Sequence, residues 1–316
     1  MGGGGTELRR AATPSSSTPA STARAWDIAE QDVQTTISVT DRAYAHDYDK
    51  VVLRGTPPQR DARDGIRKHL LGVQAAMQVQ LFGTCLVDTF FPEAGEATVR
   101  LLRRFGAEPV FPKGQTCCGQ PAFNAGYEAG ARAAAEHFLW EFDGDDPIVT
   151  PSGSCAAMVR HYYPWLFRDD PSLLAKAKRA GERIYELTQY LVHVAKAHEA
   201  GLRGKGTVTY HASCHLTRSL GVREEPLTLL SSLQGGTFVP MPDADRCCGF
   251  GGTFMAKLPE ISCALADEKA ASIEATGADT VTGCDSGCLM NIADAMRRRG
   301  TKIRVAHIAQ LLAEGL

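Results

Sequence analysis

The sequence predicts an α/β protein made of two repeated halves, each with a parallel sheet, behind an extension without regular structure. Short apolar stretches alternate with amphipathic helical stretches over residues 77–316, an order typical of parallel sheets with crossover helices. Nine of the ten cysteines recur in the same order in both halves. The predicted parts are an extension over 1–76, a first cysteine-rich domain over 77–170, a helical linker over 171–205 and a second cysteine-rich domain over 206–316.

Each half is predicted as strand, helix, strand, helix and strand, with a cysteine after each strand and a final helix. In the first half, the strands are predicted over 78–83, 109–112 and 147–150, and the helices over 96–105 and 122–142. In the second half, the strands are predicted over 207–210, 237–241 and 279–282, and the helices around 227–233 and over 259–276.

The cysteines are in register between the halves. Each half has a single cysteine, an adjacent pair followed by glycine, and one or two further cysteines. They are Cys85, Cys117, Cys118 and Cys155 in the first half and Cys214, Cys247, Cys248, Cys284 and Cys288 in the second. The pair follows the first cysteine after 31 residues in one half and 32 in the other. Because ligands of parallel sheets bind beyond the carboxyl ends of the strands, we expect these thiols to converge there.

Clustered cysteines form disulfides, bind zinc or bind iron–sulfur clusters. Disulfide scaffolds are typical of short secreted chains, whereas this chain has 316 residues, 44% of them hydrophobic, and no apolar signal segment. Zinc sites usually draw ligands from short C-x2-4-C loops, so zinc remains an alternative at one site. Adjacent cysteines, with Cα atoms about 3.8 Å apart, suit a cluster that offers several iron atoms. We therefore predict an iron–sulfur cluster in each half.

The two halves differ in their last cysteines. Aligning the preceding strands places Ser152 opposite Cys284 and, after a gap of one residue, Cys155 opposite Cys288. The first half then offers four thiols, enough for an ordinary cubane cluster. Five thiols in the second half exceed one per iron, which indicates either an unusual, opened cluster there or iron bound through a bridging thiolate.

Three other residues draw attention. His211 and His215 flank Cys214, and we expect them to lie beside the cluster rather than to bind it, because the cysteines suffice. Cys263 lies outside the pattern, and its helical surroundings predict a buried structural thiol. No Ser-His-Asp order, pair of acid and base carboxylates or phosphate loop is evident, so the catalytic residues are not assigned.

The extension over 1–76 is rich in Gly, Ser, Thr, Ala and Pro and has no apolar periodicity. We expect it to be disordered, or to come from an over-long gene start, with Met77 as the alternative start. No apolar run approaches the ~20 residues of a membrane span. A net charge of −2 and a pI near 6.5 do not favour nucleic-acid binding.

Four motifs resemble the lactate-utilization protein A family. They are TCLVDTFFPE at 84–93, QTCCGQPA at 115–122, PSGSCAAM at 151–158 and CCGFGGTF at 247–254. That family is part of the wider group of CCG-domain proteins, which includes the cysteine-rich subunits of heterodisulfide reductase and of anaerobic glycerol-3-phosphate dehydrogenase. The resemblance covers 77–316 and leaves 1–76 unaccounted for.

The resemblance implies a cytoplasmic iron–sulfur oxidoreductase subunit that transfers electrons in the oxidation of L-lactate to pyruvate. It implies two partner proteins, one of them a ferredoxin-like iron–sulfur subunit. In the heterodisulfide reductase relative, five-cysteine motifs hold non-cubane [4Fe–4S] clusters, which implies the same for the complete second motif here. The first motif departs from this pattern at Ser152, so its cluster type stays open.

Two other functions are compatible with the residues. One is a thiol–disulfide redox catalyst like the heterodisulfide reductase relative, and the other is a zinc-stabilised structural subunit. Activity on a disulfide without partner proteins would identify the first, and metal analysis would identify the second. The sequence does not name the electron acceptor, the subunit that binds lactate or the oligomeric state.

Overall fold

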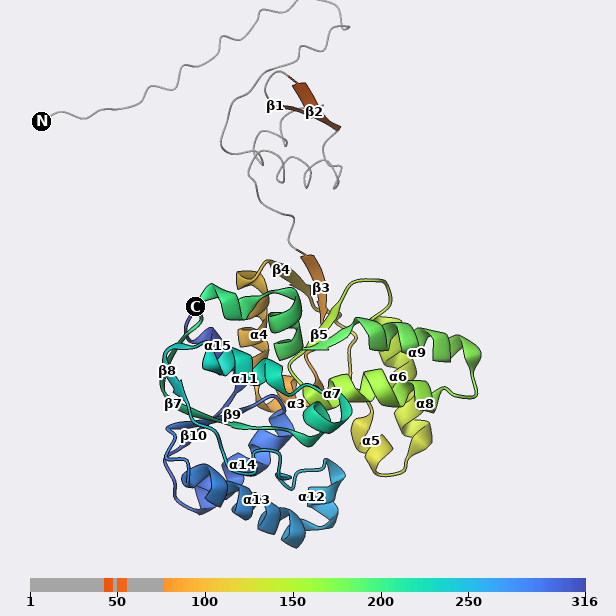
Figure 1. The fold of residues 1–316 in the computed structure, drawn as a ribbon. Helices are drawn as coiled ribbons and strands as arrows, with labels where there is room; N and C mark the ends of the chain where they lie inside the picture. Colours follow the sequence, from red (N-terminus) through yellow and green to blue (C-terminus); the bar gives the residue numbers. More distant parts are fainter. Residues whose placement is uncertain (1–42, 48–49, 56–76) are drawn as a thin grey trace, which may run out of the picture. The chain divides into compact units, whose positions relative to one another are not determined.

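A computed structural model describes residues 43–47, 50–55 and 77–316, which belong to two separate units, Met1–Ala75 and Ala76–Leu316. In the first unit, strands β1 (Ala43–Asp47) and β2 (Lys50–Gly55) pair as an antiparallel hairpin (Figure 1). The extension predicted over 1–76 contains this hairpin, and the rest of that prediction lies outside the described residues.

The second unit contains two parallel sheets of four strands each. The first has the order β4 (Ala107–Val110), β3 (Met77–Leu81), β5 (Ile148–Thr150) and β6 (Ile184–Glu186). The second has the order β8 (Gln234–Phe238), β7 (Arg203–His211), β9 (Thr280–Gly283) and β10 (Arg304–His307). The strands follow the same spatial order in both halves. The predicted α/β class and the internal repeat are confirmed.

Helices cover the sheets. Those of the first half are α3 (Cys85–Phe90), α4 (Pro92–Arg104), α5 (Gln120–Asn124), α6 (Glu128–Glu141), α7 (Gly153–Ala157), α8 (Tyr163–Leu166) and α9 (Pro171–Arg183). They are followed by α10 (Leu187–Gln189), α11 (Glu224–Ser231), α12 (Thr253–Lys257), α13 (Pro259–Glu274), α14 (Ser286–Arg298) and α15 (Ile308–Ala313). Short π-helical turns lie at η1 (Met158–Tyr162), η2 (Tyr190–Val194) and η4 (His215–Ser219), and a 3₁₀ turn lies at η3 (Ala197–Ala200). Figure 1 shows α6, α8 and α9 gathered on one side of this unit and α12, α13 and α14 at another.

The two halves share a hydrophobic core. Helix α15, at the end of the second half, packs on α4 of the first, and α10 packs on α11 of the second. The shared core includes Leu101, Tyr210, Leu229 and Leu312. Each half also has a smaller core of its own. This exchange of helices explains why 76–316 forms one compact unit rather than two independent domains.

Three predicted elements need correction. The single helix over 122–142 is two helices, because the chain turns at Gly126, whose φ of +82° interrupts helical geometry. The linker over 171–205 contains β6, the fourth strand of the first sheet, which is too short to show a periodic pattern. Strand β7 begins at Arg203, before residue 206, where the second domain was predicted to begin. The pair β10 and α15 was not predicted.

Cys263 was predicted to be buried, and this is wrong. Its thiol is exposed on α13, and the neighbouring Ser262 faces inward instead. Ser262 Oγ donates a hydrogen bond to the Gly249 carbonyl at 2.8 Å, which sets the inward face of the helix. Within the part of the chain that the structure describes, no helix is long and apolar enough to cross a membrane.

Candidate metal centre

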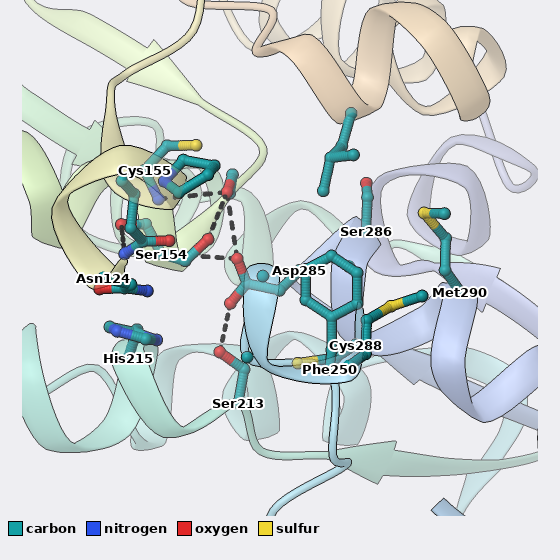
Figure 2. Close-up of a pocket in the computed structure, with 18 of the residues that line it drawn as sticks. Asn124, Ser154, Cys155, Ser213, His215, Phe250, Asp285, Ser286, Cys288 and Met290 are labelled. Carbon is teal, nitrogen blue, oxygen red and sulfur yellow. Dashed lines mark hydrogen bonds between the residues drawn. The ribbon is translucent and has the colours of Figure 1, made fainter. Parts of the chain in front are cut away.

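Eight cysteines line one cavity of about 430 Å³ beyond the carboxyl ends of the two sheets. They are Cys85, Cys117, Cys118 and Cys155 from the first half and Cys214, Cys247, Cys248 and Cys288 from the second. Part of the wall is apolar, with Leu86, Phe250, Met255 and Met290, and Figure 2 shows Phe250 and Met290 on the same side as Cys288. Eight of the nine patterned thiols thus meet beyond the strand ends, as the sequence predicted. The two sets line the same cavity.

The adjacent cysteines of the first half lie in a tight turn. Gly119, which follows the pair, has a φ of +84°, and its N–H donates to Cys117 Sγ at 3.4 Å. Cys118 is buried with its Sγ atom 3.4 Å from Cys155 Sγ. The Tyr163 hydroxyl donates to the Cys118 carbonyl at 2.9 Å and holds the turn against the first half's own core.

The second half repeats this turn. Gly249 has a φ of +83°, and its N–H donates to Cys247 Sγ at 3.3 Å. The Asn291 amide donates to the Cys248 carbonyl at 2.6 Å, in the role that Tyr163 has in the first half. Both turns therefore present one half-buried or exposed thiol and one buried thiol to the cavity.

The thiols within each set perturb one another. Cys117 has a lowered pKa because its sulfur accepts hydrogen bonds from Cys118 and Cys85, and the pKa values of these two donors are raised in return. Burial, followed by the charge of Cys247, raises the pKa of Cys214. Thiolates packed this closely repel one another, whereas a bound metal ion deprotonates its thiol ligands outright. The donor set therefore fits a thiolate-ligated metal centre in each half.

Cys284 does not line this cavity. Its side chain is fully buried in the shared core, where the Tyr210 hydroxyl lies 3.6 Å from Cys284 Sγ. Cys284 is the residue directly after β9, and its contact with Tyr210, the β7 partner of Thr282, places it on the core side of the strand end. The structure separates the fifth cysteine of the second motif from the other four.

The sheet register shows how the halves correspond. Leu81 and Tyr210 each lie four residues before the first cysteine of their half. Leu81 pairs with Val149 in the first sheet, and Tyr210 pairs with Thr282 in the second. Val149 and Thr282 are therefore equivalent positions.

This register corrects the predicted alignment by one residue. Three residues beyond the paired positions, Ser152 is equivalent to Asp285, and both are the N-caps of the helices that carry the last cysteine. Cys284 is equivalent to Pro151, and Cys155 matches Cys288 without a gap. The predicted equivalence of Ser152 and Cys284 is wrong, so each half contributes four matched thiols.

Asp285 joins the two halves at the cavity wall, and no motif in the sequence had singled it out. Its Oδ1 atom accepts hydrogen bonds from Ser152 Oγ at 3.0 Å and from the Ser154 N–H at 2.9 Å, both in the first half. Its Oδ2 atom accepts from Ser213 Oγ in the second half. Figure 2 shows the carboxylate between these partners. Its position directly after β9, at a helix N-cap, is the signal that could have identified it.

The two histidines predicted beside the cluster differ in position. His215 lines the cavity, with Nδ1 3.7 Å from Cys214 Sγ. His211 is 1% exposed, and burial, aided by the charge of Lys269, lowers its pKa to about 3. One atom each of His211, Cys248 and Cys288 lie within 4.8 Å of one another. His211 is thus neutral and next to two thiols of the second set.

Glu186 is a second buried titratable group, close to the Cys284 thiol and the Tyr210 hydroxyl. Its Oε2 atom accepts hydrogen bonds from the N–H, at 2.8 Å, and the hydroxyl of Thr188. Burial raises its pKa to about 8; the Thr188 bonds oppose this shift, and the charge of Asp285 adds to it. The folded protein therefore keeps a proton that the unfolded chain releases near pH 4.5.

This difference predicts a pH dependence of stability. Because the folded state binds the extra proton between about pH 4.5 and 8, the free energy of unfolding falls as the pH rises through that window. Between pH 6 and pH 8 we expect wild type to lose about 2 kcal/mol that the Glu186→Gln variant retains. Urea denaturation of both proteins at both pH values measures this. Equal losses in the two proteins would contradict it.

Comparisons with known proteins agree with the repeat. Residues 79–160 and 208–293 match the CCG family model, described as a cysteine-rich domain. A Lactate utilization protein A of Geobacillus sp. (strain WCH70) is 50% identical over 236 residues, which cover 75% of this chain and 99% of that relative. A Lactate utilization protein A 2 of Bacillus cereus (strain Q1) is 47% identical over 240 residues, 76% of this chain and 99% of that relative.

One solved structure has a lower similarity. A hypothetical protein from Helicobacter pylori superposes with a TM-score of 0.47 and 10% identity, over 82% of this chain and 54% of that one. This similarity is too low to support an inference about function.

Proposed function

The chain belongs to the lactate utilization protein A family, and on that premise we propose that it is an iron–sulfur protein that transfers electrons in the oxidation of L-lactate to pyruvate. The observation that carries the proposal is the meeting of eight matched thiols in one cavity. The names of the relatives, which refer to lactate utilization, support L-lactate as the substrate of the system. Thiolate sets of this kind favour iron–sulfur clusters, and zinc is the alternative metal.

In this proposal the two four-cysteine sets each hold one centre, and the bound clusters supply one-electron transfer. The chain's own groups tune the reduction potential of the clusters and limit their contact with water. The N–H groups of Gly119 and Gly249 donate to cysteine sulfur, and such hydrogen bonds tune reduction potentials. Cys118 and Cys248 are buried, which keeps water from these ligands. A shared cavity keeps both centres together, so that electrons pass between them within one subunit.

The proposal also includes partners. The name of the relatives, lactate utilization protein A, implies that other lactate-utilization proteins act beside them. We therefore assign lactate oxidation to a complex of this chain with two such proteins. One of these is a ferredoxin-like iron–sulfur subunit that exchanges electrons with this chain. A cytoplasmic location stays a prediction.

Anaerobic purification of the full chain tests the metal. We expect iron and acid-labile sulfide, a visible absorption that bleaches on reduction, and loss of about half the iron when Cys117 and Cys118 are both replaced by Ala. The matched Cys247→Ala, Cys248→Ala double variant is expected to lose a similar share. Protein that binds only zinc after anaerobic loading with iron and sulfide would overturn the proposal.

A second measurement tests the reaction. Lactate is expected to reduce the clusters only when the partner proteins are present, as followed by the bleaching of the visible absorption. Reduction of a disulfide by this chain alone would instead identify it as a thiol–disulfide catalyst.

A further inference from the structure

His211 is a buried histidine whose ring makes no hydrogen bond of normal geometry in the described part of the chain. It is the last residue of β7 and is 1% exposed. The Ala244 backbone acts on the ring and opposes the lowering of its pKa, but this contact does not meet hydrogen-bond geometry at either ring nitrogen. Leaving a buried polar group unpaired costs about 1–3 kcal/mol. The Ala244 backbone can engage only one ring nitrogen, so the other is expected to have a partner that is not part of the polypeptide.

The surroundings of His211 suit a metal ligand. One of its ring nitrogens and the Sγ atoms of Cys248 and Cys288 all lie within 4.8 Å of one another, and all three residues are buried. Metal–nitrogen bonds of about 2.0 Å and metal–sulfur bonds of about 2.3 Å place the ligands of one tetrahedral ion about 3.5–4 Å apart. The largest separation of up to 4.8 Å exceeds that spacing by about 1 Å, so binding requires the side chains to move together by about that distance.

The first half provides an internal comparison. Phe82 is the equivalent of His211, because each lies three residues before the first cysteine of its half. The helix carbonyl nearest to Gly119 is that of Ala131, and the one nearest to Gly249 is that of Ser262. Phe138 and Lys269 each lie seven residues after these carbonyls and are therefore equivalent. The rings of Phe82 and Phe138 pack edge to face, with centroids 5.0 Å apart. An apolar pair thus fills this space beside one cysteine set, so packing alone does not require a histidine beside the other.

In the second half the equivalent pair is His211 and Lys269, and only the lysine has its hydrogen bonds satisfied. Lys269 Nζ donates to the carbonyls of Asp243 at 2.7 Å and Ala244 at 3.1 Å, so the buried ammonium has partners. His211 has only the Ala244 backbone nearby among the described residues, and neither ring nitrogen makes a hydrogen bond of normal geometry. Cys284, the other candidate for an extra donor, faces Tyr210 in the shared core instead of the cavity.

We propose that His211 supplies a ring-nitrogen ligand to the metal centre held by Cys214, Cys247, Cys248 and Cys288, and that Cys284 does not bind it. This inference deepens the proposed function and rests on it. The second centre then has four thiolates and one imidazole, whereas the first has thiolates alone.

Nitrogen hyperfine coupling tests the ligand directly. The full chain is produced with ¹⁵N-labelled histidine, loaded anaerobically with iron and sulfide, reduced and measured by pulsed paramagnetic resonance. We expect a ¹⁵N coupling typical of a directly bound imidazole, which persists in His215→Gln and disappears in His211→Phe, the residue that the first half has at this position. Bound iron without such a coupling, or a coupling that survives in His211→Phe, would overturn the inference.

Two further variants separate ligation from folding. His211→Cys replaces the imidazole by a thiolate and is expected to retain wild-type iron content, lose the nitrogen coupling and lower the potential of one centre. Cys284→Ala is expected to retain both the iron and the coupling. Loss of iron in Cys284→Ala with a folded chain, or an unchanged potential in His211→Cys, would contradict the proposed ligand set.

Cobalt distinguishes failure of this inference from failure of the proposed function. If no iron–sulfur cluster assembles, the proposed function fails, and Co²⁺ added alone then tests the ligand. A ¹⁵N coupling to Co²⁺ that is lost in His211→Phe would support His211 as a ligand of a simple metal site. Binding of Co²⁺ without nitrogen coupling would overturn the inference by itself.

Discussion

Gly249→Ala is expected to lower the free energy of unfolding by about 3–5 kcal/mol and to release metal from the second cysteine set. Gly249 has a φ of +83°, which costs an alanine about 1–2 kcal/mol. A Cβ atom there would also lie 2.4 Å from the backbone carbonyl oxygen of Ser262, an overlap that no side-chain rotation relieves. Helix α13 must therefore move away from the turn that carries Cys247 and Cys248. Anaerobic urea denaturation and iron analysis measure the two effects.

Two other glycines provide matched controls. Gly277 has a φ of +66°, and no atom lies within 4 Å of the position that a Cβ would take there, so Gly277→Ala carries only the conformational cost of about 1–2 kcal/mol. In the first half, a Cβ at Gly119 would lie 3.0 Å from the Ala131 carbonyl oxygen, so Gly119→Ala is expected between the two. Equal losses in all three variants would show that close approach to the helix does not matter.

Asp285→Ala is expected to lower the free energy of unfolding by about 3–5 kcal/mol, because a buried carboxylate with three donors is removed at once. Its partners Ser152, Ser154 and Ser213 come from both halves, so the loss weakens the junction between them. Asp285→Asn keeps one acceptor oxygen and is expected to lose less than the alanine variant. Denaturation at matched metal loading gives the comparison.

Asp170 is the control for this prediction. Its carboxylate accepts the N–H groups of Ser172 and Leu173 at the start of α9, but it is partly exposed and contacts only the first half. Asp170→Ala is expected to cost about 1 kcal/mol, as for an ordinary N-cap. A similar loss for Asp285→Ala would mean that the link across the halves adds nothing to stability.

Several features of the site follow from local sequence. The apolar stretches of strand length and the cysteines directly after them place most thiols at one edge of parallel sheets. The CCG turns need a glycine at positive φ, and both have it. The helix break at Gly126 and the three-residue strand β6 could not be predicted with the same certainty, because neither leaves a periodic pattern in the sequence.

The role of Cys284 depends on a register that the sequence does not display. Side chains alternate between the two faces of a strand, so at the end of a strand a shift of one residue in register decides whether a thiol faces the cavity or the core. The pairing of Tyr210 with Thr282 decides this, and it places Asp285 rather than Cys284 opposite Ser152. An alignment gap of one residue concealed the difference.

The two repeated halves, their parallel sheets and the meeting of thiols at the strand ends could all be predicted from the amino-acid order, because they depend on short-range periodicity and on spacing along the chain. The packing of the folded chain was needed to show that both sets share one cavity, that His211 lies beside Cys248 and Cys288, and that Asp285 bonds across the halves. These contacts join residues far apart in sequence. Their geometry comes from how the sheets and helices pack, which no local pattern encodes.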